Sequence, residues 1–132
     1  SFKNFSFNFD SAAGIIYTVD VTKPKGEKVT ITSMADGTPF SLDKMYKVAL
    51  NSYRGNGGGE LLTKGSGISQ DELKDRILYS TDKDLRYYLM QYIEKKGVIE
   101  PHALGLWRFI PEEWVEPAAK RDYEYLFGKV EK

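Results

Sequence analysis

Apolar and polar residues alternate along the first part of the chain, and this alternation predicts β-strands. The segment GIIYTVDV (14–21) is rich in β-branched residues with polar residues between them, and VTITS (29–33) repeats the pattern. Proline and glycine in the connecting TKPKGEK suit a turn, so the two segments predict a hairpin. After an Asp-Gly turn signal at 36–37, YKVALN (46–51) predicts a third strand that leads into a glycine-rich loop.

The pattern changes to a helical period after this loop. Ser69 and Glu72 form a capping-box pattern, which predicts the start of a short helix. A second helix is expected to start near Thr81 or Asp82 and to end at Gly97, which stands where a C-terminal cap belongs.

The last third of the chain predicts one strand and two helical segments. LWRFI (106–110) is a strand candidate, and PEEW (111–114) predicts a single helical turn. A final helix is expected over 117–127, with Pro117 at its first position and Gly128 just beyond its end. Strands followed by helices indicate an α+β fold, a mixed β-sheet with helices packed on it.

Composition places the chain among ordinary globular domains and excludes several classes of function. Its 132 residues are enough for one domain. Nineteen basic residues balance nineteen acidic ones, so we expect no nucleic-acid polymer as a partner. No apolar run approaches the roughly 18 residues of a membrane span, and residues 1–10 lack the pattern of a signal peptide. We therefore expect no membrane insertion. The chain has no cysteine, which excludes disulfides.

Candidate catalytic chemistry is scarce. His102 is the only histidine, whereas zinc and dinuclear hydrolase sites usually use several histidines and carboxylates. No G-x-S-x-G motif accompanies it, which argues against a Ser-His-Asp arrangement. We therefore expect neither a catalytic residue nor a metal ligand in this chain.

The segment SYRGNGGGE (52–60) concentrates four glycines in five positions. It is not a phosphate-binding P-loop, because Lys64 precedes Gly65 instead of following it. It also lacks the spacing of a dinucleotide fingerprint, and we expect no helix to open there. Two explanations remain open: a tight structural turn, or a backbone that a ligand approaches closely.

Three stretches carry a resemblance to a known family: FNFDSAAGIIYTVDVTKP (7–24), DGTPFSLDKMYKVALNSYRGNGGGE (36–60) and STDKDLRYYLMQYIEKKG (80–97). They resemble the C-terminal, substrate-binding domain of the 5'-nucleotidase family. Within it, they are most similar to bacterial 2',3'-cyclic-nucleotide 2'-phosphodiesterases with 3'-nucleotidase activity. The resemblance covers nearly all of residues 1–132 and implies a single, partial domain.

The resemblance implies a role in nucleotide catabolism. In the family, an N-terminal metallophosphoesterase domain with two divalent metal ions hydrolyses the phosphate ester, and the C-terminal domain holds the nucleoside. By this resemblance we expect a periplasmic or secreted bacterial protein, a nucleotide or nucleoside ligand, and no cofactor or bond-breaking residue in this chain.

The resemblance also places Tyr53 at the aromatic position that stacks on the nucleobase. A flat ring suits this role, because stacking contributes about 1–3 kcal/mol per base. The glycines beside it would leave room for base and ribose. Arg54 is expected to contact a phosphate or the base, or else to form a surface ion pair. Two asparagines either hold the loop through local bonds or contact the base directly. The expected substrate-binding residues are Asn51, Tyr53, Arg54, Asn56, Gly57, Gly58 and Gly59.

Two departures from the family pattern qualify this expectation. Gly59 stands where 5'-nucleotidases carry an aspartate that binds the ribose hydroxyls, which suits a cyclic or 3'-phosphorylated substrate. The upstream segment that supplies the second aromatic of the base clamp is not in the chain. Phe5, Phe7 and Phe9 either replace it or form one face of a strand. We thus expect a fragment, with an unpaired sheet edge that promotes self-association.

Another class of function stays open. The chain is alternatively a non-catalytic nucleotide-binding module, or a protein-interaction domain that keeps only the fold.

Overall fold

The computed structural model describes residues 9–128. The chain divides into two compact units. We call them the sheet unit (Asp10–Lys44 and Ala103–Lys132) and the loop unit (Ser1–Phe9 and Met45–His102). The α+β expectation is confirmed, because strands and helices both form and the sheet is mixed.

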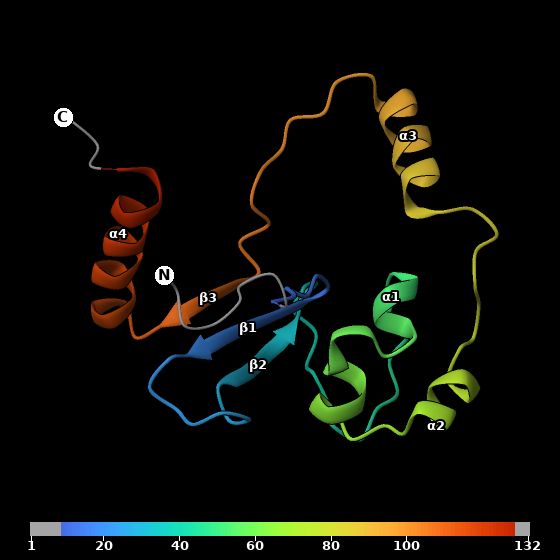
Figure 1. Cartoon of the computed structure of the whole chain (residues 1–132), viewed down its shortest axis with the longest axis horizontal. Coiled ribbons are helices and arrows are strands. Elements are labelled where there is room, and N and C mark those ends of the chain that lie inside the picture. The colour runs from blue at the N-terminus through green and yellow to red at the C-terminus, as the bar shows by residue number, and fades with distance from the viewer. Residues whose placement is uncertain (1–8, 129–132) are drawn as a thin grey trace. The chain divides into compact units, whose positions relative to one another are not determined.

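The sheet unit contains a three-stranded sheet in the order β2-β1-β3 (Figure 1). Strands β1 (Ile15–Asp20) and β2 (Val29–Met34) pair antiparallel, which confirms the predicted hairpin. Strand β3 (Trp107–Ile110) pairs with β1 in parallel, with Tyr17 opposite Trp107. The central strand therefore joins segments from both ends of the described chain.

The core of the sheet unit lies on one face of β1. Tyr17 and Val19 alternate with more exposed residues and keep only 5% and 8% of their surface exposed. The ring of Tyr17 stacks on Trp107 with a centroid distance of 5.8 Å, and Trp107 meets Phe109 edge to face at 5.1 Å. Alternation thus places the aromatic side chains of two paired strands together.

Helix α4 (Glu112–Phe127) follows β3 and corrects the expected division of this segment. It runs without interruption from the predicted turn at 111–114 through the predicted helix at 117–127. Pro117 lies inside the helix and not at its first position, while Gly128 caps the end as expected. A proline in a helix removes one backbone hydrogen bond, and two glutamates in the first turn favour the earlier start.

The loop unit is helical. Its elements are α1 (Ser52–Gly55), the single turns η2 (Gly58–Glu60) and η3 (Leu61–Gly65), α2 (Gln70–Asp75) and α3 (Leu85–Lys96). The strand predicted over 46–51 is wrong, because these residues pair with no strand in the described part of the chain.

The two helices predicted after the loop are confirmed, with one shift. Helix α2 begins at the predicted capping box, and α3 ends at the predicted Gly97. Helix α3 starts later than expected, after Asp84, whose side chain accepts a hydrogen bond from the Tyr87 amide. Within residues 9–128, no helix is both long and apolar enough to cross a membrane.

Candidate functional site

The glycine-rich segment begins with a helical turn, contrary to the expectation that no helix opens there. Asn51 is the N-cap of α1, and its Oδ1 accepts a hydrogen bond from the Arg54 amide at 2.8 Å. Capping by an asparagine side chain satisfies an amide that the short helix leaves without a partner. Asn51 therefore makes the local bond that was one of its two predicted roles.

Tyr53 presents its ring to solvent, with 63% of its surface exposed. Gly58 lies directly against it. A Cβ atom at Gly58 would stand 2.6 Å from the ring carbons Cδ2 and Cε2 and 2.5 Å from the Tyr53 carbonyl oxygen. Carbon atoms pack at about 3.5–4.0 Å, so any side chain at this position would displace the ring or the peptide. Glycine at 58 is what allows the tyrosine ring to rest on the backbone.

The glycines on either side of Gly58 hold backbone conformations in the left-handed region. Gly57 has φ 88° and Gly59 has φ 71°, which glycine adopts without the steric penalty of a side chain. Glu60 continues the reversal with φ 60°, and its carboxylate pairs with the Lys64 ammonium at 2.7 Å. The segment is therefore a tight turn whose positive φ angles require glycine at positions 57 and 59.

Arg54 is buried, with 8% of its surface exposed. Its Nη1 donates a hydrogen bond to the Gly58 carbonyl oxygen at 3.1 Å, and its guanidinium carbon lies 5.3 Å from the centre of the Tyr53 ring. Its burial differs from the surface location that the predicted ion pair implied. The guanidinium joins the ring and the glycine peptide into one cluster, which we call the Tyr53–Arg54–Gly58 cluster.

Helix α2 supports the turn from a second direction. Gln70 Nε2 donates a hydrogen bond to the Asn56 carbonyl oxygen at 3.0 Å. A Cβ at Gly57 would meet Gln70 Oε1 at 2.8 Å and Leu73 Cδ1 at 3.3 Å, and Leu73 itself is only 5% exposed. These supporting residues were not predicted. The capping box located the helix, but no spacing in the sequence indicates that α2 packs back on the turn.

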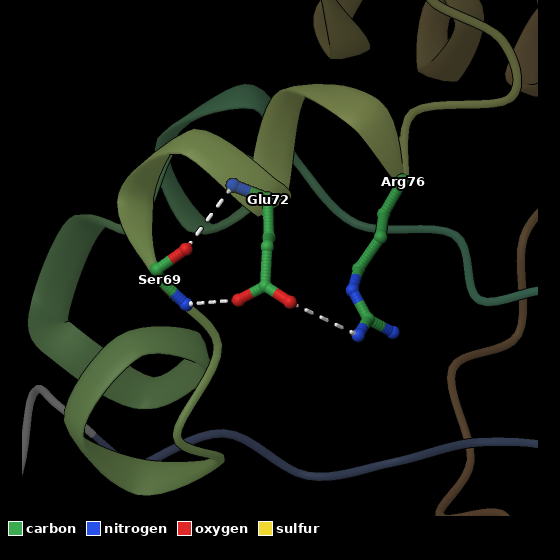
Figure 2. A network of polar contacts seen from close by, with 3 residues as sticks. All are labelled: Ser69, Glu72 and Arg76. Carbon is green, nitrogen blue, oxygen red and sulfur yellow. Dashed lines mark hydrogen bonds and ion pairs between the residues drawn. The ribbon is translucent and has the colours of Figure 1, made fainter.

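The start of α2 is fixed by a reciprocal pair of hydrogen bonds (Figure 2). The Ser69 amide donates to Glu72 Oε2 at 2.9 Å, and the Glu72 amide donates to Ser69 Oγ at 3.3 Å. Arg76 approaches the same carboxylate at 4.0 Å. The hydrogen bond from the Ser69 backbone, with smaller contributions from its hydroxyl and from Arg76, lowers the pKa of Glu72.

The remaining predicted residues are Asn56 and three phenylalanines near the start of the chain. Asn56 contributes backbone bonds to the turn, from its amide to the carbonyls of Ser52 and Arg54. Phe5 and Phe7 lie outside the described residues, while Phe9 is 53% exposed and in no strand. No group of three or more His, Cys, Asp or Glu residues within 9–128 is arranged to hold a metal ion.

Comparison with known proteins gives a family for this arrangement. Residues 3–64 match the model of the 5'-nucleotidase C-terminal domain, and this range includes the whole glycine-rich turn. The chain is 31% identical over 121 residues to the trifunctional nucleotide phosphoesterase protein YfkN of Bacillus subtilis, which covers 83% of this chain and 8% of the relative. It is 30% identical over 121 residues to a 2',3'-cyclic-nucleotide 2'-phosphodiesterase/3'-nucleotidase of Haemophilus influenzae, covering 80% of this chain and 17% of the relative.

The chain thus spans a small part of the length of both curated relatives. No solved structure matches it. The domain match and the two phosphoesterase relatives agree with the resemblance that the sequence shows. We conclude that residues 3–64 of the chain belong to the 5'-nucleotidase C-terminal domain family.

Proposed function

We propose that this chain is the nucleoside-recognition part of a phosphoesterase that acts on nucleotides, with the Tyr53 ring as the platform on which the base stacks. The observation that carries the proposal is the exposed ring held on Gly58, within a turn fixed by Arg54 and α2. An aromatic ring that is both exposed and held in place by backbone stacks a base with little loss of side-chain entropy.

The names of the two relatives support the class of substrate. One is a nucleotide phosphoesterase and the other a 2',3'-cyclic-nucleotide 2'-phosphodiesterase/3'-nucleotidase. We assign hydrolysis, and any metal ions that it uses, to a separate phosphoesterase domain of the same protein. The residues of this chain bind and orient the nucleoside. We further propose that the protein works in the periplasm or outside the cell.

The test of stacking is calorimetric titration of adenosine into the full-length protein that contains this chain. Tyr53→Ala is expected to weaken binding by about 1–3 kcal/mol, whereas Tyr53→Phe keeps the ring and most of the affinity. The matched control is Tyr79→Ala, which removes another exposed tyrosine of the loop unit. Unchanged affinity in a folded Tyr53→Ala variant would show that the turn is structural only.

The glycine at position 59 supports a second part of the proposal, which concerns the type of phosphate ester that the full-length protein hydrolyses. Because residue 59 is glycine, the turn has no side-chain carboxylate there to accept hydrogen bonds from a free pair of ribose hydroxyls. A 2',3'-cyclic phosphate has no such pair, so we expect the full-length protein to hydrolyse 2',3'-cyclic AMP faster than 5'-AMP. The opposite preference in a direct comparison of kcat/KM would remove this part of the proposal.

A further inference from the structure

We infer that Arg54 is a positioning residue, which sets the orientation of the Tyr53 ring and so prepares the stacking surface without binding the phosphate itself. This inference rests on the proposed function of Tyr53. It assigns to Arg54 a role that differs from both roles expected from the sequence.

The burial of Arg54 is the first observation. A charged side chain is seldom buried unless its donors are hydrogen-bonded, because desolvation of an ion is costly. Arg54 is 8% exposed and donates from Nη1 to the Gly58 carbonyl at 3.1 Å. Across the described residues that are not exposed, no buried side-chain nitrogen or oxygen lacks a hydrogen-bond partner. The guanidinium is thus engaged inside the protein.

The second observation is the contact between adjacent residues. Consecutive side chains of a helix point about 100° apart and do not face each other. Nevertheless, the Arg54 guanidinium carbon lies over the Tyr53 ring, 5.3 Å from its centre. Helical geometry alone does not produce this contact. The hydrogen bond to Gly58 favours it, because it directs the guanidinium toward the residue on which the ring rests.

Gly58 connects the two side chains. The Cα atom of Gly58 is so close to the Tyr53 ring that a Cβ atom would stand 2.6 Å from two ring carbons. The carbonyl oxygen of Gly58 accepts the hydrogen bond from Arg54. Gly58 and the Arg54 guanidinium therefore both lie against the Tyr53 ring, and 63% of the tyrosine stays exposed. Planar guanidinium groups suit such stacked and hydrogen-bonded positions better than an ammonium. The exposed part of the ring is where a base would stack.

The experiment is a double-mutant cycle in the full-length protein, read by calorimetry with adenosine and with adenosine 3'-phosphate in chelator, so that the ester is not hydrolysed. Arg54→Met keeps an unbranched side chain in place of the aliphatic part of arginine and removes the donors. We expect it to weaken the binding of both ligands by the same factor, about tenfold. In the Tyr53→Ala background, Arg54→Met is expected to change adenosine binding by less than about twofold, because the group through which it acts is gone.

Three results would overturn the inference: weakening confined to adenosine 3'-phosphate, equal weakening in both backgrounds, or no weakening. The first would show that Arg54 binds phosphate, and the second that it acts independently of Tyr53. Arg54→Lys serves as a second variant. It keeps the charge and lacks the planar group, so it is expected to weaken adenosine binding as well. Full affinity in this variant would also contradict the inference.

A spectroscopic reading separates this inference from the proposed function. In NMR spectra, Arg54→Met is expected to shift the Tyr53 ring resonances, and Tyr53→Ala is expected to shift the Arg54 Nε–H resonance, whether or not a ligand binds. If Tyr53→Ala leaves adenosine binding unchanged, the proposed function fails, and the ring resonances still decide the position of Arg54. Unmoved ring resonances in Arg54→Met would exclude the positioning role.

Discussion

The contact between Gly58 and Tyr53 predicts that one methyl group will disturb the turn. In Gly58→Ala the new Cβ would stand 2.5 Å from the Tyr53 carbonyl oxygen and 2.6 Å from two ring carbons. Normal packing distances are about 3.5–4.0 Å, so ring and peptide must each move by about 1 Å. Overpacking of this kind costs about 1–3 kcal/mol.

The matched control is Gly55→Ala, three residues earlier in the same segment. A Cβ at Gly55 meets nothing within 4 Å, and Gly55 lies in α1. Alanine is favoured over glycine in a helix by about 0.8–1.0 kcal/mol, so this variant is expected to be neutral or slightly stabilising. The two substitutions add the same atom and differ only in their surroundings.

Hydrogen exchange read by mass spectrometry reports this difference locally. For peptides that cover the turn, a loss of about 1–3 kcal/mol in the free energy of opening corresponds to exchange roughly 5–150 times faster in Gly58→Ala. Peptides from the sheet unit are expected to exchange as in the wild type. Equal exchange of the turn in Gly58→Ala and Gly55→Ala would refute the packing argument.

Four further predictions concern local features of the chain. Ser69→Ala removes the cap of α2 and is expected to cost about 1 kcal/mol of local stability, measured by hydrogen exchange. The folded-state pKa of Glu72 is lowered, so the stability that its ionised carboxylate contributes is fully present above the ordinary glutamate pKa. This stability is lost as the pH falls through the folded-state pKa, and a carboxyl NMR titration would follow the change. Thr22→Val removes the hydroxyl bond that is the largest cause of the lowered pKa of Asp20, so that pKa is expected to rise in the same type of titration. Pro117→Ala restores a helical amide inside α4 and is expected to raise helix stability by about 1–3 kcal/mol in thermal unfolding, whereas a helix that began at this residue would gain almost nothing.

Features that depend on neighbouring residues in the sequence could be predicted. The hairpin of β1 and β2 follows from alternation and a turn between the strands, and α2 follows from a capping box four residues long. Gly97 and Gly128 ended helices as their positions indicated. In each case, the residues that determine the structure are close together in the sequence.

Features that depend on distant contacts could not be predicted in the same way. Residues 46–51 alternate like a strand, but a strand also needs a partner, and alternation does not report one. The sequence indicated Tyr53 and the glycines as a unit, although not which glycine touches the ring. That detail depends on positive φ at Gly57 and Gly59 and on the support of α2, fourteen residues beyond Asn56.

The parallel pairing of β1 with β3 has a consequence for synthesis on the ribosome. Tyr17 and its partner Trp107 are about 90 residues apart in the chain. At a synthesis rate of about 5–20 residues per second, the edge of β1 that pairs with β3 stays unpaired for on the order of ten seconds. During that interval the hairpin presents a row of unpaired backbone groups, which is a template for strands of other chains. The order of synthesis therefore leaves one edge of the central strand β1 unpaired until β3 has been made.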